Sequence, residues 1–276
     1  MKIYISADIE GIWGVVSRSH IINTEKDYER GRKLMTDEIN IAVGEAFKNG
    51  AKEIVLNDSH GSMDNITIEH LHPRVKLISG QPKVLSMMEG IDNTFDGVMF
   101  IGYHPRSGSQ NGIFDHTYSS RTIAEIKING KPLGECGLNG RAAGYYGVPV
   151  IFLSGDTTVT KQAKEEIGNI ETLAVKDSLS RYCAANLSRL ELETKYKEKI
   201  KTAFNNISKY PIISYDGEIK LEVTFYSPVM ADSAMLIPRV KREDDKSVSY
   251  ISNDYIEIYK LFRVMISLAG LAFLAK

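Results

Sequence analysis

Residues 1–10 read Met1-Lys2-Ile3-Tyr4-Ile5-Ser6-Ala7-Asp8-Ile9-Glu10, a mostly apolar run that ends in two carboxylates. Three similar runs follow, at Glu53 to Asp58, Gly97 to Gly102 and Val148 to Leu153. None of them alternates cleanly between apolar and polar residues, which is typical of strands covered on both faces. Residues 24–48, between the first two runs, have helical spacing of apolar residues and close at Asn49-Gly50. These patterns predict an α/β fold, a mostly parallel sheet flanked by helices.

Two features interrupt this series. The segment from Thr122 to Ile128 alternates apolar and polar residues and is followed by Asn129-Gly130, a strong tight-turn signal, so we predict an inserted β-hairpin. After a helical stretch at residues 188–205, we expect strands near 220–225 and 248–251 and a terminal helix at 261–275. We therefore predict a larger α/β domain at 1–210, which carries the site discussed below, and a smaller C-terminal α+β part at 211–276.

The composition narrows the class of protein. The 34 Lys and Arg residues nearly balance the 35 Asp and Glu residues, so nucleic acid is not the expected partner. Only Cys136 and Cys183 occur, which excludes a disulfide scaffold and suits a reducing cytoplasm. Asp8 comes too early for a cleavable signal peptide, and residues 261–275 contain Arg263 and are too short for a membrane span. We expect a cytoplasmic protein without a membrane partner.

Side chains that bind metals follow three of the four apolar runs. Asp8 and Glu10 follow the first run, His60 the second and His104 the third. Ligands in parallel α/β sheets gather at the carboxyl ends of the strands, and residues 8 and 10 of an extended segment project to the same side. Glu135, after the hairpin, adds a third carboxylate, and His116 lies in the loop before the hairpin.

Two imidazoles and three carboxylates form a nitrogen and oxygen donor set that suits Zn²⁺ or Mn²⁺ and is large enough for two ions sharing one carboxylate. Two such ions activate water and polarise a carbonyl, which favours hydrolytic chemistry. An Asp or His at a strand end is also commonly a helix cap or a solvated turn residue, and placement alone favours an ordinary loop position for His116.

Other polar residues have simpler interpretations. We expect a buried thiol at Cys136, a helix cap at Asp156, solvated turns at His70 and His72, and no role for His20. Asp58 either orients a histidine ligand or belongs to a turn. Motifs for dinucleotides, for the phosphate-binding P-loop, for zinc peptidases of the H-E-x-x-H type and for serine hydrolases are absent from the sequence.

Five short motifs occur in order along the chain: Ser6-Ala7-Asp8-Ile9-Glu10-Gly11, Asn57-Asp58-Ser59-His60, Gly102-Tyr103-His104, Asp115-His116 and Gly134-Glu135-Cys136-Gly137-Leu138-Asn139. In these motifs the sequence resembles the D-aminopeptidase family, binuclear zinc metallopeptidases of bacterial dipeptide-transport operons. The resemblance implies that Asp8 bridges two zinc ions, that Glu10 and His60 complete one site and His104 and Glu135 the other, and that His116 is the catalytic histidine. It further implies short substrates with an N-terminal D-residue, such as D-Ala-D-Ala, and a decameric ring.

The expected mechanism is attack of metal-bound hydroxide on the peptide carbonyl, with His116 transferring a proton or stabilising charge. Covalent attack by His116 itself is the alternative that the sequence leaves open. Two other functions use the same donors. A two-metal phosphoesterase would need cationic residues aimed at the phosphate, for which Arg106 is the main candidate in the sequence. A non-catalytic oligomeric binding protein would hold a structural ion with closed coordination.

Overall fold

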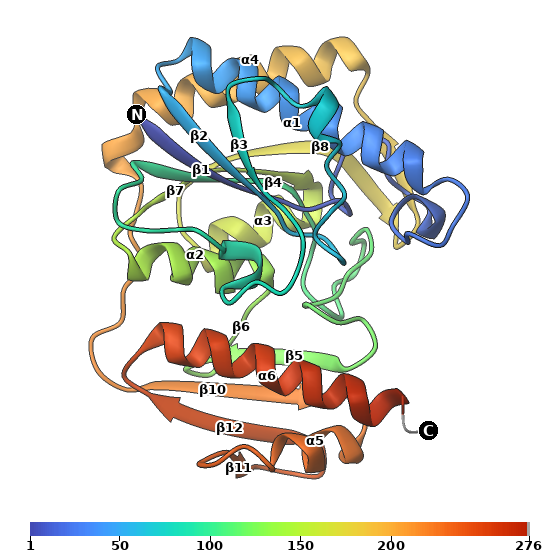
Figure 1. The fold of residues 1–276 in the computed structure, drawn as a ribbon, viewed down its shortest axis with the longest axis vertical. Helices are drawn as coiled ribbons and strands as arrows, with labels where there is room; N and C mark the ends of the chain where they lie inside the picture. Colours follow the sequence, from blue (N-terminus) through green and yellow to red (C-terminus); the bar gives the residue numbers. More distant parts are fainter. Residues whose placement is uncertain (275–276) are drawn as a thin grey trace.

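The computed structural model describes residues 1–274, whose strands form two sheets (Figure 1). The first sheet has seven strands in the order β3-β2-β1-β4-β7-β8-β9 among these residues. Neighbouring strands are parallel except for β8 and β9. The mostly parallel sheet is thereby confirmed. Its strands are β1 (Lys2–Ala7), β2 (Glu53–Asp58), β3 (Val75–Ile78), β4 (Gly97–Tyr103), β7 (Val150–Asp156), β8 (Glu171–Ser180) and β9 (Cys183–Asn186).

Helices cover both faces of this sheet (Figure 1). The helices α1 (Tyr28–Lys48) and α4 (Arg189–Asn205) lie on one face, and α2 (Glu135–Tyr145) and α3 (Thr157–Glu166) on the other. All residues of β4 and β7 are buried, which explains why their sequences do not alternate. The helix predicted at 24–48 begins only at Tyr28, because residues 21–27 form turns in which Asp27 accepts a hydrogen bond from Ser19.

The second sheet is antiparallel, in the order β11-β12-β10-β5-β6, and lies at the bottom of Figure 1. It contains the predicted hairpin, whose Asn129 and Gly130 have φ of 52° and 76°, as a tight primed turn requires. The strands are β5 (Ile123–Ile128), β6 (Lys131–Pro132), β10 (Ile219–Phe225), β11 (Lys241–Arg242) and β12 (Ser247–Ser252). The sheet thus combines strands from both sides of residue 210, and a domain boundary there stays a prediction.

The terminal helix α6 (Tyr255–Leu274) joins the two parts. It packs against β10, β12 and α5 (Pro228–Ala234) and contacts α2 under the first sheet. Ala275 of the predicted helix lies outside the described residues. None of the helices within 1–274 combines the length and apolar character that a membrane crossing requires. Short 3₁₀ helices complete the fold: η1 (Arg18–His20), η2 (Ile68–His70), η3 (Ser86–Met88) and η4 (Ile207–Lys209).

The centre of the first sheet is a topological switch point. The chain runs from β1 outward to β2 and β3 and then returns to β4 on the other side of β1. Such points open a crevice at the carboxyl ends of the strands. The segment after β1 stays attached to the end of β4, because the amide of Asp8 donates to the carbonyl of Ile101 and that of Gly11 to Gly102, both at 2.8 Å.

Candidate metal centre

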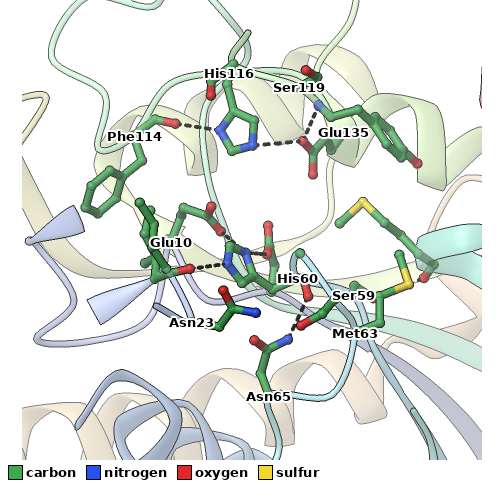
Figure 2. A pocket seen from close by; sticks show the side chains of 18 of the residues that line it. Glu10, Asn23, Ser59, His60, Met63, Asn65, Phe114, His116, Ser119 and Glu135 are labelled. Carbon is green, nitrogen blue, oxygen red and sulfur yellow. Dashed lines mark hydrogen bonds and ion pairs between the residues drawn. The ribbon is translucent and has the colours of Figure 1, made fainter. Parts of the chain in front are cut away.

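The six predicted site residues converge at this crevice. Asp8 and Glu10 follow β1, and His60 and His104 follow β2 and β4. Glu135 is the first residue of α2, and His116 comes from the loop between β4 and β5. Figure 2 shows Glu10, His60, His116 and Glu135 around one cavity. The three carboxylates and His104 are buried, while His60 and His116 are slightly exposed to the cavity.

The carboxylate of Asp8 lies between two imidazoles. Its Oδ1 is 3.3 Å from Nδ1 of His60 and its Oδ2 is 3.4 Å from Nε2 of His104. Each imidazole also faces a second carboxylate: Oε2 of Glu10 lies 3.0 Å from His60, and Oε1 of Glu135 lies 3.3 Å from His104. The geometry is therefore two imidazole–carboxylate pairs that share one carboxylate.

Backbone carbonyls fix the orientation of the three histidines. Nε2 of His60 lies 2.8 Å from the carbonyl of Ile21, Nδ1 of His104 3.0 Å from that of Pro105, and Nδ1 of His116 2.8 Å from that of Phe114. A carbonyl only accepts, so each of these nitrogens carries a hydrogen. In the neutral ring the opposite nitrogen then presents a lone pair to the acidic cluster, as a metal ligand does.

The charges of the cluster are those of a site that holds cations. Burial and the neighbouring Glu10 raise the pKa of Asp8 to about 8. Burial lowers the pKa of His104, but Glu135, Asp8 and Glu10 outweigh it and raise this pKa to about 10. Without an ion, protons on the imidazoles therefore balance the carboxylates. Burial and the adjacent His104 instead lower the pKa of His116, which favours its neutral form.

Two buried atoms of the cluster lack hydrogen-bond partners within residues 1–274. They are Oε2 of Glu10, whose contact with His60 lacks hydrogen-bond geometry, and Nε2 of His104. Two overlapping sets of three donors have ligand atoms within 4.8 Å of one another, namely Asp8, Glu10 and His104, and His104, His116 and Glu135. A divalent cation would satisfy the orphaned atoms, so the residues present fit a metal.

The donors open into a cavity of about 760 Å³, which is large enough for a small-molecule ligand. Its wall contains polar and aromatic side chains from distant segments, among them Asn23, Tyr28, Asn65 and Tyr118. It also contains four arginines: Arg18, Arg121, Arg181 and Arg263.

Comparison with known proteins identifies the family. A D-aminopeptidase family model matches residues 1–264. The chain belongs to the D-aminopeptidase family. It is 38% identical over 270 residues to the D-aminopeptidase of Bacillus subtilis (strain 168), with 98% of each chain covered. Among solved structures it matches the Zn-dependent D-aminopeptidase DppA from Bacillus subtilis, a self-compartmentalizing protease, with a TM-score of 0.95, 38% identity and 98% of each chain covered. The resemblance and the fold class are confirmed.

Other candidate residues have structural roles in this D-aminopeptidase family member. Asp58 does not orient an imidazole: it is buried and accepts hydrogen bonds from the amides of Asn65 and Ile66, at 2.6 and 2.8 Å, which folds the loop after His60. Asp156 caps α3 as predicted, accepting from the amide of Val159 at 2.7 Å. Cys136 is buried as predicted. Arg106, the proposed phosphate ligand, pairs with Glu166 at 2.9 Å and does not line the cavity.

Lys176 supports the candidate metal centre although no motif of the sequence contains it. It is fully buried in β8, and its ammonium donates to the carbonyls of Glu10, Ile12 and Val15 at 2.7, 2.8 and 2.7 Å. All three donors are thereby used, and the segment that carries Glu10 is held in place. The sequence gives no signal for it, because Lys176 directly follows Val175 and strand alternation would place it on the face opposite Leu173 and Val175. Its burial coincides with a register shift between β7 and β8.

Proposed function

We propose that the protein is a zinc-dependent aminopeptidase that removes an N-terminal D-residue from short peptides of the D-Ala-D-Ala type. Membership of the D-aminopeptidase family and the Zn dependence of the relative DppA support this function. The observation that carries it is the position of Asp8 between two imidazole–carboxylate pairs in a buried cluster. A phosphoesterase loses the cation that the sequence offered, because Arg106 is engaged by Glu166. Four other arginines line the cavity, so family membership is what favours the peptidase.

In this proposal each subunit binds two zinc ions. Asp8 would be a ligand shared by both ions, Glu10 and His60 would hold one of them, and His104 and Glu135 would hold the other. The separate contacts of the two Asp8 oxygens with His60 and His104 support the assignment. When bound, the zinc ions lower the pKa of a water molecule and polarise the scissile carbonyl.

His116 supplies the proton transfer. Its Nδ1–H is held by the carbonyl of Phe114, which leaves the lone pair on Nε2, 3.7 Å from Oε1 of Glu135, to accept a proton from the attacking water. The same nitrogen then returns the proton to the leaving amine as the C–N bond breaks. Burial lowers the pKa of His116, which favours the neutral ring that can accept a proton.

The proposal includes the cellular form of the enzyme. We infer a homo-oligomer, a decameric ring in the cytoplasm, with no nucleic-acid or membrane partner. The description of DppA as a self-compartmentalizing protease supports assembly. Light scattering of the purified protein is expected to give a mass near ten subunits, and a clean monomer would contradict this assembly.

Elemental analysis combined with substrate assays tests the function. We expect about two zinc ions per chain, hydrolysis of D-Ala-D-Ala, and little hydrolysis of L-Ala-L-Ala or p-nitrophenyl phosphate. Preference for the phosphate ester would overturn the peptidase assignment. Asp8→Asn should lose both ions because a bridging carboxylate serves both, while Asp216→Asn, at an exposed position before β10, serves as the matched control. Retention of two ions by Asp8→Asn would contradict the bridge.

A further inference from the structure

Arg263 on α6 lies in the wall of the same cavity as the metal donors. It lines the cavity, is half-buried, and its guanidinium carbon lies 5.2 Å from the centre of the Tyr118 ring. The amide of Tyr118 in turn donates to Oε1 of Glu135 at 2.6 Å. One residue therefore connects the guanidinium to the metal centre. The cation–π contact restricts the position of a long side chain that would otherwise be mobile.

The charge of Arg263 has no anionic partner within the described part of the chain, where it forms no ion pair and donates no side-chain hydrogen bond. The other arginines of the cavity differ from it. Arg181 is paired with Asp115, at 3.1 Å to the carboxylate and 2.8 Å to the carbonyl. Arg18 and Arg121 are exposed to solvent, which screens their charge. A half-buried guanidinium without a counter-ion favours binding of an anion from the cavity.

We propose that Arg263 binds the C-terminal carboxylate of the peptide substrate and thereby makes the enzyme selective for dipeptides with a free carboxyl end. This inference rests on the proposed aminopeptidase function. The carboxylate of a dipeptide lies one residue, about 3.5 Å of extended chain, beyond the scissile amide, so it stays close to the metal centre. The planar fork of a guanidinium matches a carboxylate with two parallel hydrogen bonds.

Kinetics on a free acid and its amide test the inference. The wild type should prefer D-Ala-D-Ala to D-Ala-D-Ala amide. Arg263→Gln should raise KM for the acid by roughly 10- to 100-fold, as expected for the loss of a hydrogen-bonded charge pair, and leave kcat and the KM for the amide nearly unchanged. Arg263→Lys should restore part of the preference, because it keeps the charge but not the fork. Arg121→Gln, which removes a charge from the same cavity, should leave the acid-to-amide ratio as in the wild type.

The outcomes separate this inference from the function on which it rests. If the wild type cleaves neither substrate, the aminopeptidase function fails and the inference fails with it. If the wild type cleaves both and Arg263→Gln affects both equally or neither, only the inference is overturned. Zinc content and thermal unfolding, measured on each variant, show whether that variant is folded. If Arg263→Gln does not fold, Arg263→Lys provides the test. A preference of Arg263→Lys for D-Ala-D-Ala over its amide equal to that of the wild type would then overturn the inference.

Discussion

In each histidine of the site, one of the two ring nitrogens is hydrogen-bonded to a backbone carbonyl, which leaves the other nitrogen available as a ligand or base. His60 uses Nε2 and His104 uses Nδ1 to donate to carbonyls, so the ring nitrogens that face Asp8 differ between them. A neutral imidazole has one donor and one acceptor, and the carbonyl decides which is which. His116 is held in the same manner by Phe114, and its ring stacks on that of His104 at 4.0 Å. The backbone thus sets the chemical role of each ring.

The role of His116 can be tested by removing its ring. His116→Ala should lower kcat by about 10²- to 10⁴-fold, the usual contribution of a general acid–base residue, and should leave two zinc ions bound. Stopped assays and elemental analysis on the same sample measure both quantities. His70→Ala, at an exposed position of η2, is the control. Loss of one zinc ion would show instead that His116 is a ligand, as its place beside His104 and Glu135 permits.

At the scale of elements, the site depends on how closely the segment after β1 approaches the end of β4. A Cβ added to Gly11 would lie 1.9 Å from the carbonyl oxygen of Tyr103. No side chain fits there, and the two neighbouring segments carry Glu10 and His104. The glycine therefore allows donors that follow two different strands to lie in one cluster.

Because the two segments approach so closely, we expect the single methyl group of a Gly11→Ala substitution to affect both stability and zinc binding. Gly11→Ala should push the two segments apart, reduce the free energy of unfolding by about 1–3 kcal/mol as overpacking does, and weaken zinc binding. Urea unfolding and zinc titration measure the two effects. Gly44→Ala is the matched control, since Gly44 lies in α1 with no atom within 4 Å of an added Cβ, and alanine should leave the helix equally or more stable. Normal zinc affinity in Gly11→Ala would show that this contact does not position the donors.

At the scale of the whole molecule, the donors come from three connections of the first sheet, those between β1 and β2, β2 and β3, and β4 and β7. Asp8 and Glu135 are far apart in sequence, and folding brings their carboxylates to the same imidazole of His104. Without a cation this concentration of charge opposes folding. The stability of the metal-free protein should therefore depend on the protons that replace the ions.

The sign of this dependence follows from the pKa shifts. Folding raises the pKa of His104 from 6.5 to about 10 and that of Asp8 from 3.8 to about 8, so the folded state binds more protons than the unfolded chain in these ranges. The stabilisation by His104 is complete below 6.5 and is lost as the pH rises through about 10. The metal-free protein should thus become less stable as the pH rises from 6.5 toward 10.

Urea unfolding at several pH values, with EDTA and with zinc, measures this effect. The zinc-loaded protein should lose less stability over the same range, because ions occupy the place of the protons and bind more tightly as the pH rises. A metal-free protein whose stability is constant or rises with pH would contradict the charge balance described for the cluster.

Local patterns in the sequence determined four strands of the first sheet (β1, β2, β4 and β7), the Asn129-Gly130 hairpin and the donors at the strand ends, but did not indicate β3, β8 or β9. These features depend on burial periodicity and on turn conformation, which act over a few residues. The tertiary structure alone decided two contacts of the site: Lys176 holds the segment of Glu10, and Arg263 lines the cavity. It also decided that Arg106 is paired with Glu166, and that the hairpin joins the C-terminal strands in one sheet. Those contacts join residues far apart in sequence. The order of the strands and the packing of the helices determine which of these residues meet, and no short stretch of sequence encodes that arrangement.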